Sequence, residues 1–163
     1  MITIRPAEEH DLEEITDIYN DAVKNTLAIW NEKTVDPDNR REWLKTRNAA
    51  GYPVLVAEDN GKTVGYASYG PFRPFEGYRY SAEISIYIEK TERGKGIGKK
   101  LLGALITHAE QNHIHVLVAG IEAGNKASIA IHKAFGFTIT GHMPEVGRKA
   151  GQWLNLVLMQ RIL

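Results

Sequence analysis

The chain of 163 residues contains no cysteine. This absence excludes disulfide scaffolds, thiolate zinc sites and cysteine nucleophiles, and it fits a reducing compartment. Long apolar runs are also missing, because no stretch approaches the roughly 18 apolar residues of a membrane span. The start, Met1 to His10, has no cationic segment that leads into an apolar one. We therefore expect a cytoplasmic protein with no membrane partner.

The sequence also lacks net charge of either sign. Twenty Lys and Arg residues balance twenty Asp and Glu residues, so no strong positive field exists to bind a nucleic acid through its phosphates. Apolar residues make up 43% and charged residues 25% of the chain, which argues against disorder and for a folded globular protein. With a prior of roughly 150 residues per domain, we expect a single domain over 1–163 and no nucleic-acid partner.

Hydrophobic periodicity predicts a mixed sheet flanked by helices. Ile84, Ile86 and Ile88 alternate with polar residues, as in a strand with one polar face. Other segments repeat apolar residues at steps of three and four, as in amphipathic helices. The expected order is a strand at 2–5, helices over 12–23 and 36–51, a hairpin of 53–58 and 63–69, a strand at 80–88, a helix through 101–109, a strand at 116–121, a helix at 128–135 and a last strand or pair within 137–163. Hairpins with two strand-to-helix crossovers predict an α/β or α+β domain.

A glycine-rich segment, Arg93-Gly-Lys-Gly-Ile-Gly98, lies between a predicted strand and a predicted helix. There, several main-chain N–H groups point outward at the positive end of the helix dipole, which favours a bound phosphate group. Glycines at 94, 96 and 98 let an anion approach the backbone, and Lys95, Lys99 and Lys100 add positive charge. The segment is therefore a candidate anion-binding bend.

Two common phosphate loops do not fit this bend. A Walker loop needs Ser or Thr after its lysine, but Lys99 is followed by Lys100. The dinucleotide fingerprint needs two residues between its second and third glycines, but only Ile97 separates Gly96 from Gly98. From these residues alone, a turn that merely connects strand to helix is an equal alternative.

The order of these residues resembles the GNAT acetyltransferase family over nearly the whole chain. Arg93, Gly96 and Gly98 fill the Arg-x-x-Gly-x-Gly pattern of its pyrophosphate loop, and Asn125 to Phe137 is similar to its second signature, in which an Asn opens a helix that ends in Gly-Phe. Within the family, the chain is similar to the phosphinothricin and methionine sulfoximine or sulfone N-acetyltransferases. The residues behind that closer similarity are Ile29-Trp30-Asn31, Thr34-Val35-Asp36, Gly51-Tyr52-Pro53, Phe72-Arg73, Gly77 to Tyr80, Glu83 and Gly147-x-Lys149-x-Gly151-x-Trp153.

This resemblance implies a fold, a reaction and an oligomeric state. The fold is a mixed, mostly antiparallel central sheet with about four flanking helices and with strands 4 and 5 splayed apart. The reaction transfers an acetyl group from acetyl-CoA to the α-amine of a small amino acid or analogue, by direct attack on the thioester. Methionine sulfoximine, methionine sulfone and phosphinothricin are the implied acceptors, and a homodimer is the implied assembly.

Two positions favour the methionine sulfoximine and sulfone branch. Phe75 stands where phosphinothricin enzymes tend to carry a second basic residue, and Asn155 stands where an aspartate is usual. The stretch Phe75 to Tyr80 also follows the pattern of the sulfoximine and sulfone branch. Phosphinothricin is therefore the less favoured acceptor.

The resemblance places acetyl-CoA on the bend and its flanks. Main-chain groups of the strand residues 86–88 are expected to pair with the pantetheine arm and to stabilise charge on the thioester oxygen, where one well-aimed donor is worth about 3 kcal/mol. Asn125 is expected to hydrogen-bond the same arm, with a plain helix cap as the alternative. The predicted set is Ile86, Tyr87, Ile88, Arg93, Gly94, Lys95, Gly96, Ile97, Gly98, Lys99, Asn125 and Ser128.

Two residues are candidates for proton transfer. An ammonium group must lose a proton before it can attack, and Glu83, which matches the family's carboxylate, is the candidate base, acting directly or through a water. An ion pair with Arg73 or Arg79 is the alternative role for Glu83. His132 stands where many GNAT enzymes have a tyrosine that protonates the leaving thiolate. A histidine that is only packed and hydrogen-bonded is the alternative.

The segment Gly70 to Gly77 is too rich in helix and strand breakers for regular structure, and we expect it to bind the acceptor. Arg73 beside Phe72 and Phe75 offers a guanidinium for a carboxylate, with aromatic walls around it. Trp30, Tyr78 and Tyr80 can complete the pocket, although such aromatics are more often core residues. The predicted acceptor-binding set is Trp30, Phe72, Arg73, Phe75, Tyr78, Arg79, Glu83 and Ser85.

Two other features predict no chemistry. His108, His113 and His115 gather at a helix end with only Glu110 nearby, which favours a solvated helix end over a metal site. Ser68 lacks the spacing and the strand-to-helix context of a nucleophile elbow, so a hydrolase is disfavoured. We expect no metal cofactor.

Two other functions stay open at this stage. One is a CoA-binding sensor or regulatory module that keeps the bend and has lost turnover. The other is an acetyltransferase that modifies an amine of a protein or peptide, which would need an open groove in place of the Arg73 pocket.

Overall fold

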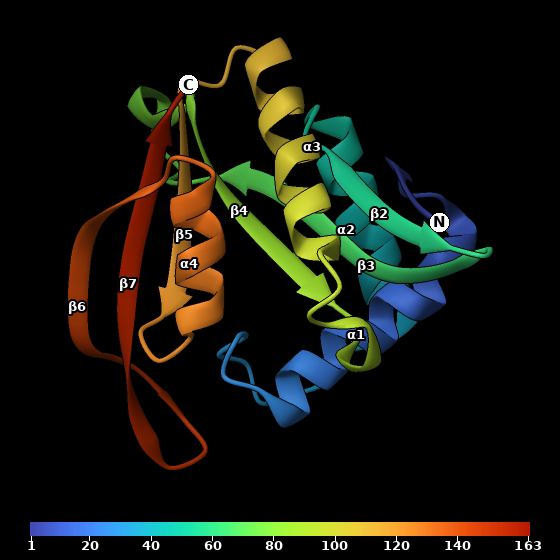
Figure 1. The fold of residues 1–163 in the computed structure, drawn as a ribbon, viewed down its shortest axis with the longest axis horizontal. Helices are drawn as coiled ribbons and strands as arrows, with labels where there is room; N and C mark the ends of the chain where they lie inside the picture. Colours follow the sequence, from blue (N-terminus) through green and yellow to red (C-terminus); the bar gives the residue numbers. More distant parts are fainter.

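Seven strands and four α-helices make up the structure, a computed structural model that describes residues 1–163 (Figure 1). Three short 3₁₀ turns connect them. The elements are β1 (Ile2–Pro6), α1 (Leu12–Asn25), α2 (Pro37–Ala49), β2 (Val54–Asp59), β3 (Lys62–Pro71), β4 (Ser81–Ile88), α3 (Ile97–Gln111), β5 (Val116–Glu122), α4 (Lys126–Ala134), β6 (Thr138–Lys149) and β7 (Gln152–Ile162).

The strands form one mixed sheet in the order β1-β2-β3-β4-β5-β7-β6. All neighbours are antiparallel except β4 and β5, which run parallel. That parallel pairing covers only residues 81–84 of β4 and 116–119 of β5, so the two strands separate beyond Ile84 and Ala119. The mixed, mostly antiparallel sheet and the splayed fourth and fifth strands confirm the fold expected from the sequence.

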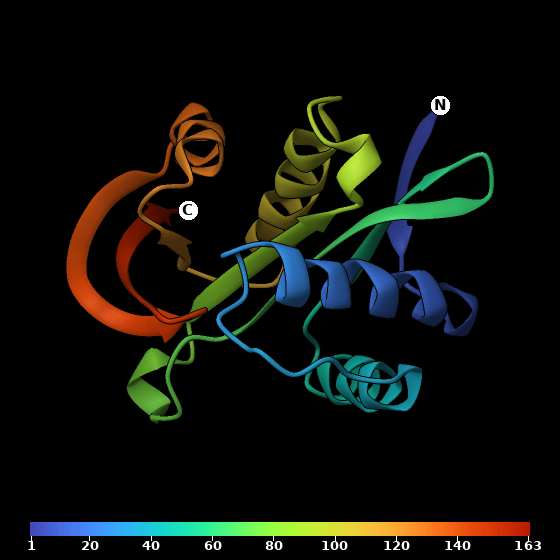
Figure 2. The same cartoon turned by 90° about the horizontal axis from the view of Figure 1, so that it is seen from below.

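Helices cover both faces of the sheet (Figure 2). On one face α1 packs through Ile15 and Ile18 onto Val56 and Tyr66, and α2 lies beside it. On the other face α3 buries its leucines in the main core, with α4 next to β5 and β7. The separation of β4 from β5 therefore opens a passage between the α1/α2 side of the sheet and the α3/α4 side.

Local sequence signals account for most element boundaries. The side chain of Asp36 accepts a hydrogen bond from the Asn39 N–H at 2.9 Å and caps α2, as its position before a proline predicts. Asn60 and Gly61 both have positive φ, which a tight hairpin turn requires. The predicted helix at 128–135 begins earlier, at Lys126, because Asn125 is its N-cap and accepts from the Ser128 N–H at 3.2 Å.

One predicted segment is more regular than expected, and the strand pair expected at the C-terminal end is confirmed. The irregular part of the breaker-rich stretch after residue 70 is shorter than predicted, because β3 continues to Pro71 and residues Glu76–Tyr78 form a 3₁₀ turn. The C-terminal segment is a pair of long strands, of which β6 is the edge of the sheet and is almost wholly exposed.

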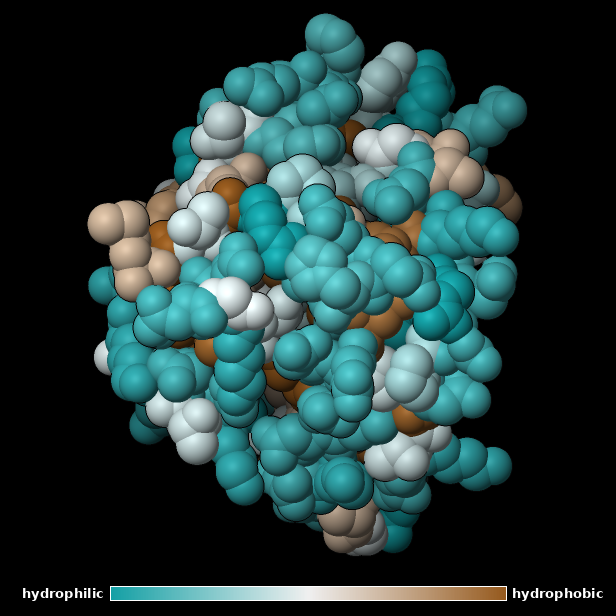
Figure 3. All heavy atoms as spheres, turned by 90° about the vertical axis from the view of Figure 1, so that its right-hand side faces the viewer, coloured by the Kyte–Doolittle hydropathy of each residue, from teal (hydrophilic) through white to brown (hydrophobic).

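Apolar surface is distributed unevenly. The face formed by the N-terminal half is mostly hydrophilic, with apolar residues in small, separate areas (Figure 3). By contrast, large apolar side chains are exposed on β6 and β7, among them Ile139, Met143, Val146 and Trp153. None of the helices combines the length and the apolar character that a membrane span requires.

Candidate active site

A cleft lies where β4 and β5 separate. Its walls come from both strands, from α4 and from the loop after α1. The lining residues are Ala28, Ile84, Ser85, Ile86, Tyr87, Ala119, Gly120, Ile121, Glu122, Asn125, Ser128 and His132. Six residues predicted for cofactor, acceptor or proton transfer thus meet in one cleft: Ser85, Ile86, Tyr87, Asn125, Ser128 and His132.

The predicted anion-binding bend lies between β4 and α3, after the end of β4 (Figure 1). No main-chain carbonyl accepts a hydrogen bond from the N–H groups of residues 93–99. Gly94 and Gly96 have φ of 78° and 83°, and a Cβ at either position would meet no atom within 4 Å. Unpaired donors, an open approach and a helix N-terminus together fit a phosphate group.

The basic side chains of the bend are held by neighbouring groups. Arg93 forms an ion pair with Asp21 at 3.3 Å and donates to the Ile88 carbonyl at 3.3 Å. Lys95 forms an ion pair with Glu92 at 2.8 Å. The donors that the bend leaves free are therefore chiefly its main-chain amides, while Lys99 is exposed and unpaired.

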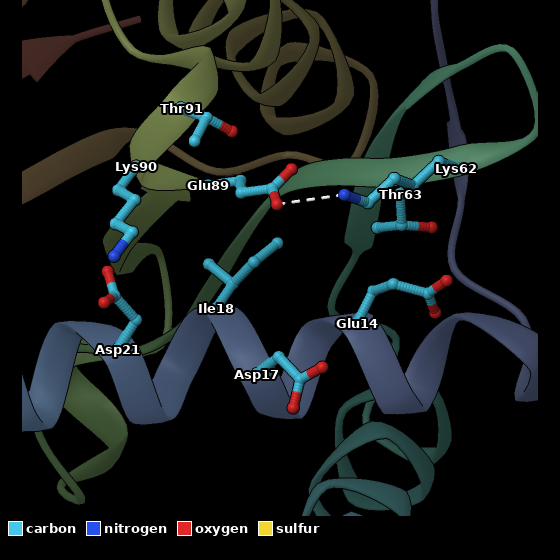
Figure 4. A pocket seen from close by; sticks show the side chains of 9 residues that line it. All are labelled: Glu14, Asp17, Ile18, Asp21, Lys62, Thr63, Glu89, Lys90 and Thr91. Atoms are coloured by element: carbon cyan, nitrogen blue, oxygen red, sulfur yellow. Dashed lines mark hydrogen bonds and ion pairs between the residues drawn. The ribbon is translucent and has the colours of Figure 1, made fainter.

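A second cleft lies beside the bend, between α1 and the segment that follows β4 (Figure 4). Carboxylates outnumber lysines there, and the ion pair of Lys62 with Glu89, at 3.0 Å, crosses it. Its lining residues are Glu14, Asp17, Ile18, Asp21, Lys62, Thr63, Glu89, Lys90 and Thr91. An acidic lining repels a diphosphate, so this cleft fits an anion less well than the bend does.

Glu83 projects from the polar face of β4 at the edge of the main cleft. A Cβ added at Gly120, on β5, would lie 3.2 Å from its Oε2 atom, so the glycine leaves room for the carboxylate. None of the ion pairs in the structure includes Glu83. Desolvation by the surrounding protein raises the pKa of Glu83, while the charges of Arg73 and Arg47 partly oppose this rise. The alternative of a structural ion pair with Arg73 or Arg79 is therefore wrong.

His132 is buried in α4, with 6% of its surface exposed. Its Nδ1 atom lies 2.7 Å from the Ser128 carbonyl oxygen, and its ring packs edge-on against Phe137. A carbonyl only accepts, so Nδ1 carries the proton. Burial lowers the pKa of His132, against an opposing effect of the Ser128 hydrogen bond. The neutral ring consequently has an unprotonated Nε2 atom, which accepts and does not donate.

The predicted acceptor residues lie in two places. Phe72 and Tyr78 pack edge to face at 5.8 Å, and the guanidinium of Arg73 lies over Phe72 at 5.3 Å. Phe75 is 73% exposed and is therefore not a core residue. Arg79 stays within its own turn, donating to the Glu76 carbonyl.

Trp30 lies in a different groove, formed by residues 30–35, Tyr19, Arg148 and Gly151. Its indole donates to the Leu27 carbonyl at 2.9 Å and lies so close to Gly147 that any Cβ there would overlap the ring. The glycine in the Gly147-x-Lys149 motif thus has a packing role that holds Trp30.

Several residues near the site were not predicted from the sequence. Arg47 of α2 acts electrostatically on Glu83, and Ala28, Gly120 and Glu122 line the cleft. Lys149 is buried and donates to the carbonyl oxygens of Thr26 and Ile29, which flank Ala28. The only signal in the sequence for these residues was glycine within strands, at positions 70 and 120. A strand glycine marks a place where another group approaches the backbone closely.

One expectation outside the site holds in part. His113 and His115 are exposed beyond the end of α3, but His108, in its last turn, is half-buried, and its Nδ1 atom lies 2.6 Å from the hydroxyl oxygen of the buried Tyr69. Nothing in the sequence indicated that β3 brings Tyr69 against α3.

The chain matches known acetyltransferases along most of its length. The family model described as an acetyltransferase (GNAT) domain matches residues 4–158. An L-methionine sulfoximine/L-methionine sulfone acetyltransferase of Salmonella typhimurium is 53% identical, over 98% of this chain and 93% of the relative. A phosphinothricin N-acetyltransferase of Alcaligenes faecalis is 39% identical, over 99% of this chain and 82% of the relative.

Solved structures agree with this similarity. The yncA structure from Salmonella typhimurium, solved with its cofactor acetyl-CoA, superposes with a TM-score of 0.98 at 52% identity and covers 100% of this chain and 94% of that one. A structure of ribosomal-protein-alanine N-acetyltransferase from Brucella melitensis superposes with a TM-score of 0.98 at 58% identity, covering 99% of both chains. The family model and these relatives show that the chain belongs to the GNAT acetyltransferase family.

Proposed function

We propose that this enzyme transfers the acetyl group of acetyl-CoA to the α-amine of a small amino acid, with methionine sulfone and methionine sulfoximine as its preferred acceptors. The observation that carries the proposal is the cleft between β4 and β5, because its wall β4 carries a carboxylate of raised pKa and leads to a bend of free main-chain amides. The name of the Salmonella relative supports the choice of acceptor.

The bend and the free edge of β4 bind the donor. The N–H groups of residues 94–99 hold its diphosphate, and the glycines keep side chains away from it. Beyond Ile84, β4 has no partner on the β5 side, so residues 86–88 can pair with the pantetheine arm there. Asn125 and Ser128, from α4, contact the same arm. Acetyl-CoA supplies the activated acyl group, and these residues hold its thioester in the cleft.

Glu83 prepares the acceptor for attack. The ammonium group of an amino acid has no free electron pair, and a carboxylate beside it removes the proton, directly or through a water. A raised pKa makes Glu83 a stronger base than a carboxylate of ordinary pKa. The amine nitrogen then attacks the carbonyl carbon of the thioester, and the carbon–sulfur bond breaks as the amide forms.

The main chain of β4 and the histidine of α4 have smaller roles. An N–H group from residues 86–88 donates to the carbonyl oxygen as it gains negative charge. His132, neutral with a free electron pair on Nε2, is not arranged as an acid for the departing sulfur. A thiolate with a reference pKa near 8.5 leaves without much help, so we assign His132 to packing.

The acceptor loop suits a neutral polar head group. A sulfone or sulfoximine head is uncharged, and Phe72, Tyr78 and Phe75 supply aromatic surface without a further cation. Phosphinothricin carries an additional anionic phosphinate, for which the loop offers no second basic residue at position 75. We therefore expect phosphinothricin to be a poorer acceptor than methionine sulfone.

A screen of acceptors tests this function. Release of coenzyme A thiol is followed for methionine sulfone, methionine sulfoximine, phosphinothricin and peptides with an N-terminal alanine, at equal concentrations. The two sulfur amino acids should react at least about tenfold faster than the others, in kcat/KM. Faster reaction of the peptides would establish a protein acceptor, as the name of the Brucella protein suggests for that relative. Tight binding of acetyl-CoA without turnover on any acceptor would establish a regulatory module.

We also propose that the enzyme is a cytoplasmic homodimer. The exposed apolar side chains of β6 and β7 provide a surface that a second copy can cover, whereas the face in Figure 3 is mostly hydrophilic. Sedimentation of the free enzyme should give twice the mass of the chain. Sedimentation at the mass of one chain would contradict the dimer.

A further inference from the structure

Arg47 reaches from α2 to the acceptor side of the cleft. Its guanidinium lies over Gly70, in β3, so closely that a Cβ at position 70 would overlap it. Its Nη1 atom donates to the Ser68 hydroxyl at 3.2 Å. The strand glycine thus leaves a notch in which the arginine lies against the backbone.

This notch is beside Glu83. In the pairing of β3 with β4, Gly70 lies directly opposite Glu83. Side chains at directly opposed positions lie on the same face, with Cβ atoms about 5 Å apart. Since Arg47 occupies the space that a side chain at position 70 would fill, its guanidinium is the cross-strand neighbour of the Glu83 carboxylate.

Arg47 has unused hydrogen-bonding capacity. A guanidinium has five N–H donors, and the Ser68 hydroxyl is the only hydrogen-bond acceptor that the structure gives it. It forms no ion pair, and the nearest aromatic ring, Trp43, lies 5.6 Å away. The guanidinium is half-buried, and burial lowers its pKa. A half-buried cation without a carboxylate partner is unfavourable unless an anion binds there.

Arg73 is the other cation that acts on Glu83. It is exposed, lies over Phe72 and makes no hydrogen bond or ion pair. Two guanidinium groups therefore surround one carboxylate, and the site as a whole is positive. A zwitterionic amino acid suits this arrangement, because its ammonium group can face Glu83 while its carboxylate faces the arginines.

We propose that Arg47, together with Arg73, binds the α-carboxylate of the acceptor and so selects amino acids over simple amines. The inference rests on the proposed function. In an α-amino acid the amine and the carboxylate share one carbon, so an amine placed at Glu83 brings the carboxylate next to the nearest cations. An arginine fork binds both oxygens of a carboxylate, which fixes the direction of the amine as well as its position.

The test compares two acceptors that differ only in this carboxylate. Methionine sulfone and its decarboxylated analogue, 3-(methylsulfonyl)propan-1-amine, are assayed with wild-type enzyme, Arg47→Met, Arg47→Lys and Lys45→Met. Lys45 lies on the exposed side of the same helix and is the matched control. Arg47→Met should lower kcat/KM for methionine sulfone by about 30-fold or more, mainly through KM. The rate with the decarboxylated amine should change less than about threefold, and Lys45→Met should leave both unchanged.

Two results would overturn the proposal. Equal losses on both acceptors, with an alkaline shift of the acidic limb of the pH profile, would mean that Arg47 acts on Glu83 alone. No loss on methionine sulfone would mean that Arg47 is only structural. If the decarboxylated amine reacts too slowly to measure, the Kd of methionine sulfone is compared between the CoA-loaded wild-type and Arg47→Met enzymes. An unchanged Kd contradicts the proposal.

Two controls distinguish failure of this proposal from misfolding of the variant and from failure of the proposed function. Thermal unfolding and the Kd for acetyl-CoA show whether Arg47→Met is folded, and Arg47→Gln, which keeps polar donors without the charge, replaces it if it is not. A wild-type enzyme that acetylates no free amino acid contradicts the proposed function itself, whatever the Arg47 variants do.

Discussion

The two sides of the cleft are built differently. On the proposed donor side, the diphosphate site is one contiguous segment, residues 93–99, whose main-chain N–H groups are free. The acceptor side is assembled from side chains that lie far apart in the sequence, including Arg47 of α2, Arg73 of the loop after β3 and Glu83 of β4. On this proposal the donor is bound by main-chain groups, whereas the acceptor is bound by individual side chains.

This difference determines what substitutions can do on each side. A backbone site tolerates changes of side chain as long as the bend keeps its shape, because N–H groups are common to all residues except proline. A side-chain site changes its ligand when one residue changes. The donor can therefore remain the same while the acceptor varies, and measurements with both ligands separate the two sides.

The largest effect is expected from Glu83→Gln. The amide cannot remove the ammonium proton, so kcat with methionine sulfone should fall by about 100-fold or more. The Kd of acetyl-CoA, measured by calorimetry, should remain within about twofold because the bend is untouched. Equal turnover by the variant and the wild type would remove the assigned role of Glu83.

The pH profile of the wild-type enzyme also tests the assignment of Glu83 as the base. Glu83 must be ionised to act, and its pKa is raised above the ordinary value of 4.5. The acidic limb of kcat/KM should therefore lie above pH 4.5, and activity should fall as the pH decreases through this limb. A limb that persists unchanged in the residual activity of Glu83→Gln would belong to another group.

The bend is tested by Gly96→Val. Gly96 has φ of 83°, where a β-branched residue is strained by about 1–2 kcal/mol. The Kd of acetyl-CoA should rise by about tenfold as the bend distorts. Gly51→Val is the matched control, since Gly51 has φ of 79° and similarly open surroundings but lies at the end of α2. A rise in Kd for the control as large as that for Gly96→Val would mean that general destabilisation, not the bend, is responsible.

A positioning role on the acceptor side is tested by Lys149→Met. Loss of the ammonium group leaves the Thr26 and Ile29 carbonyls without this donor, and the free energy of unfolding should fall by about 2 kcal/mol. The loop that carries Ala28 and Trp30 is then less well held, so KM for methionine sulfone should rise by about tenfold or less. KM for acetyl-CoA should not change. Lys133→Met, at an exposed position of α4, should alter neither constant.

The smallest effect is expected from His132. Its pKa in the folded chain is below the unfolded value near 6.5, so the unfolded chain binds a proton first as the pH falls. This group therefore destabilises the folded enzyme progressively below about pH 6.5. Between about pH 7.5 and pH 5.5, the free energy of unfolding of His132→Gln should therefore fall less than that of the wild type. The kcat of the variant at pH 7.5 should be less than about fivefold lower than that of the wild type. A loss of 100-fold would instead make His132 an acid in the reaction.

The two sides of the cleft also differ in how much of each can be predicted from the sequence. The strand–bend–helix order around residues 93–98 is local, so its glycines and helix start can be identified without a structure. The splayed strands followed only from the family resemblance, because strand pairing between 81–84 and 116–119 is not local. Asn125 was predicted correctly as the start of a helix, since a cap is a local signal.

The acceptor side was predicted in part. Arg73 and Glu83 were both proposed from the sequence, and the charge of Arg73 does act on Glu83. The alternative, a structural ion pair between them, is absent. Arg47 was missed because nothing in the sequence of α2 shows that its side chain reaches Gly70, in β3. Lys149 was missed as a donor for the same reason, since its carbonyl partners lie more than a hundred positions earlier in the chain.

A crystal structure of the enzyme with coenzyme A and methionine sulfone bound together tests the two-sided cleft most directly. We expect diphosphate oxygens within hydrogen-bond distance of the N–H groups between Gly94 and Lys99, with the amine of methionine sulfone facing Glu83. A diphosphate held elsewhere, or an amine turned away from Glu83, would contradict this expectation.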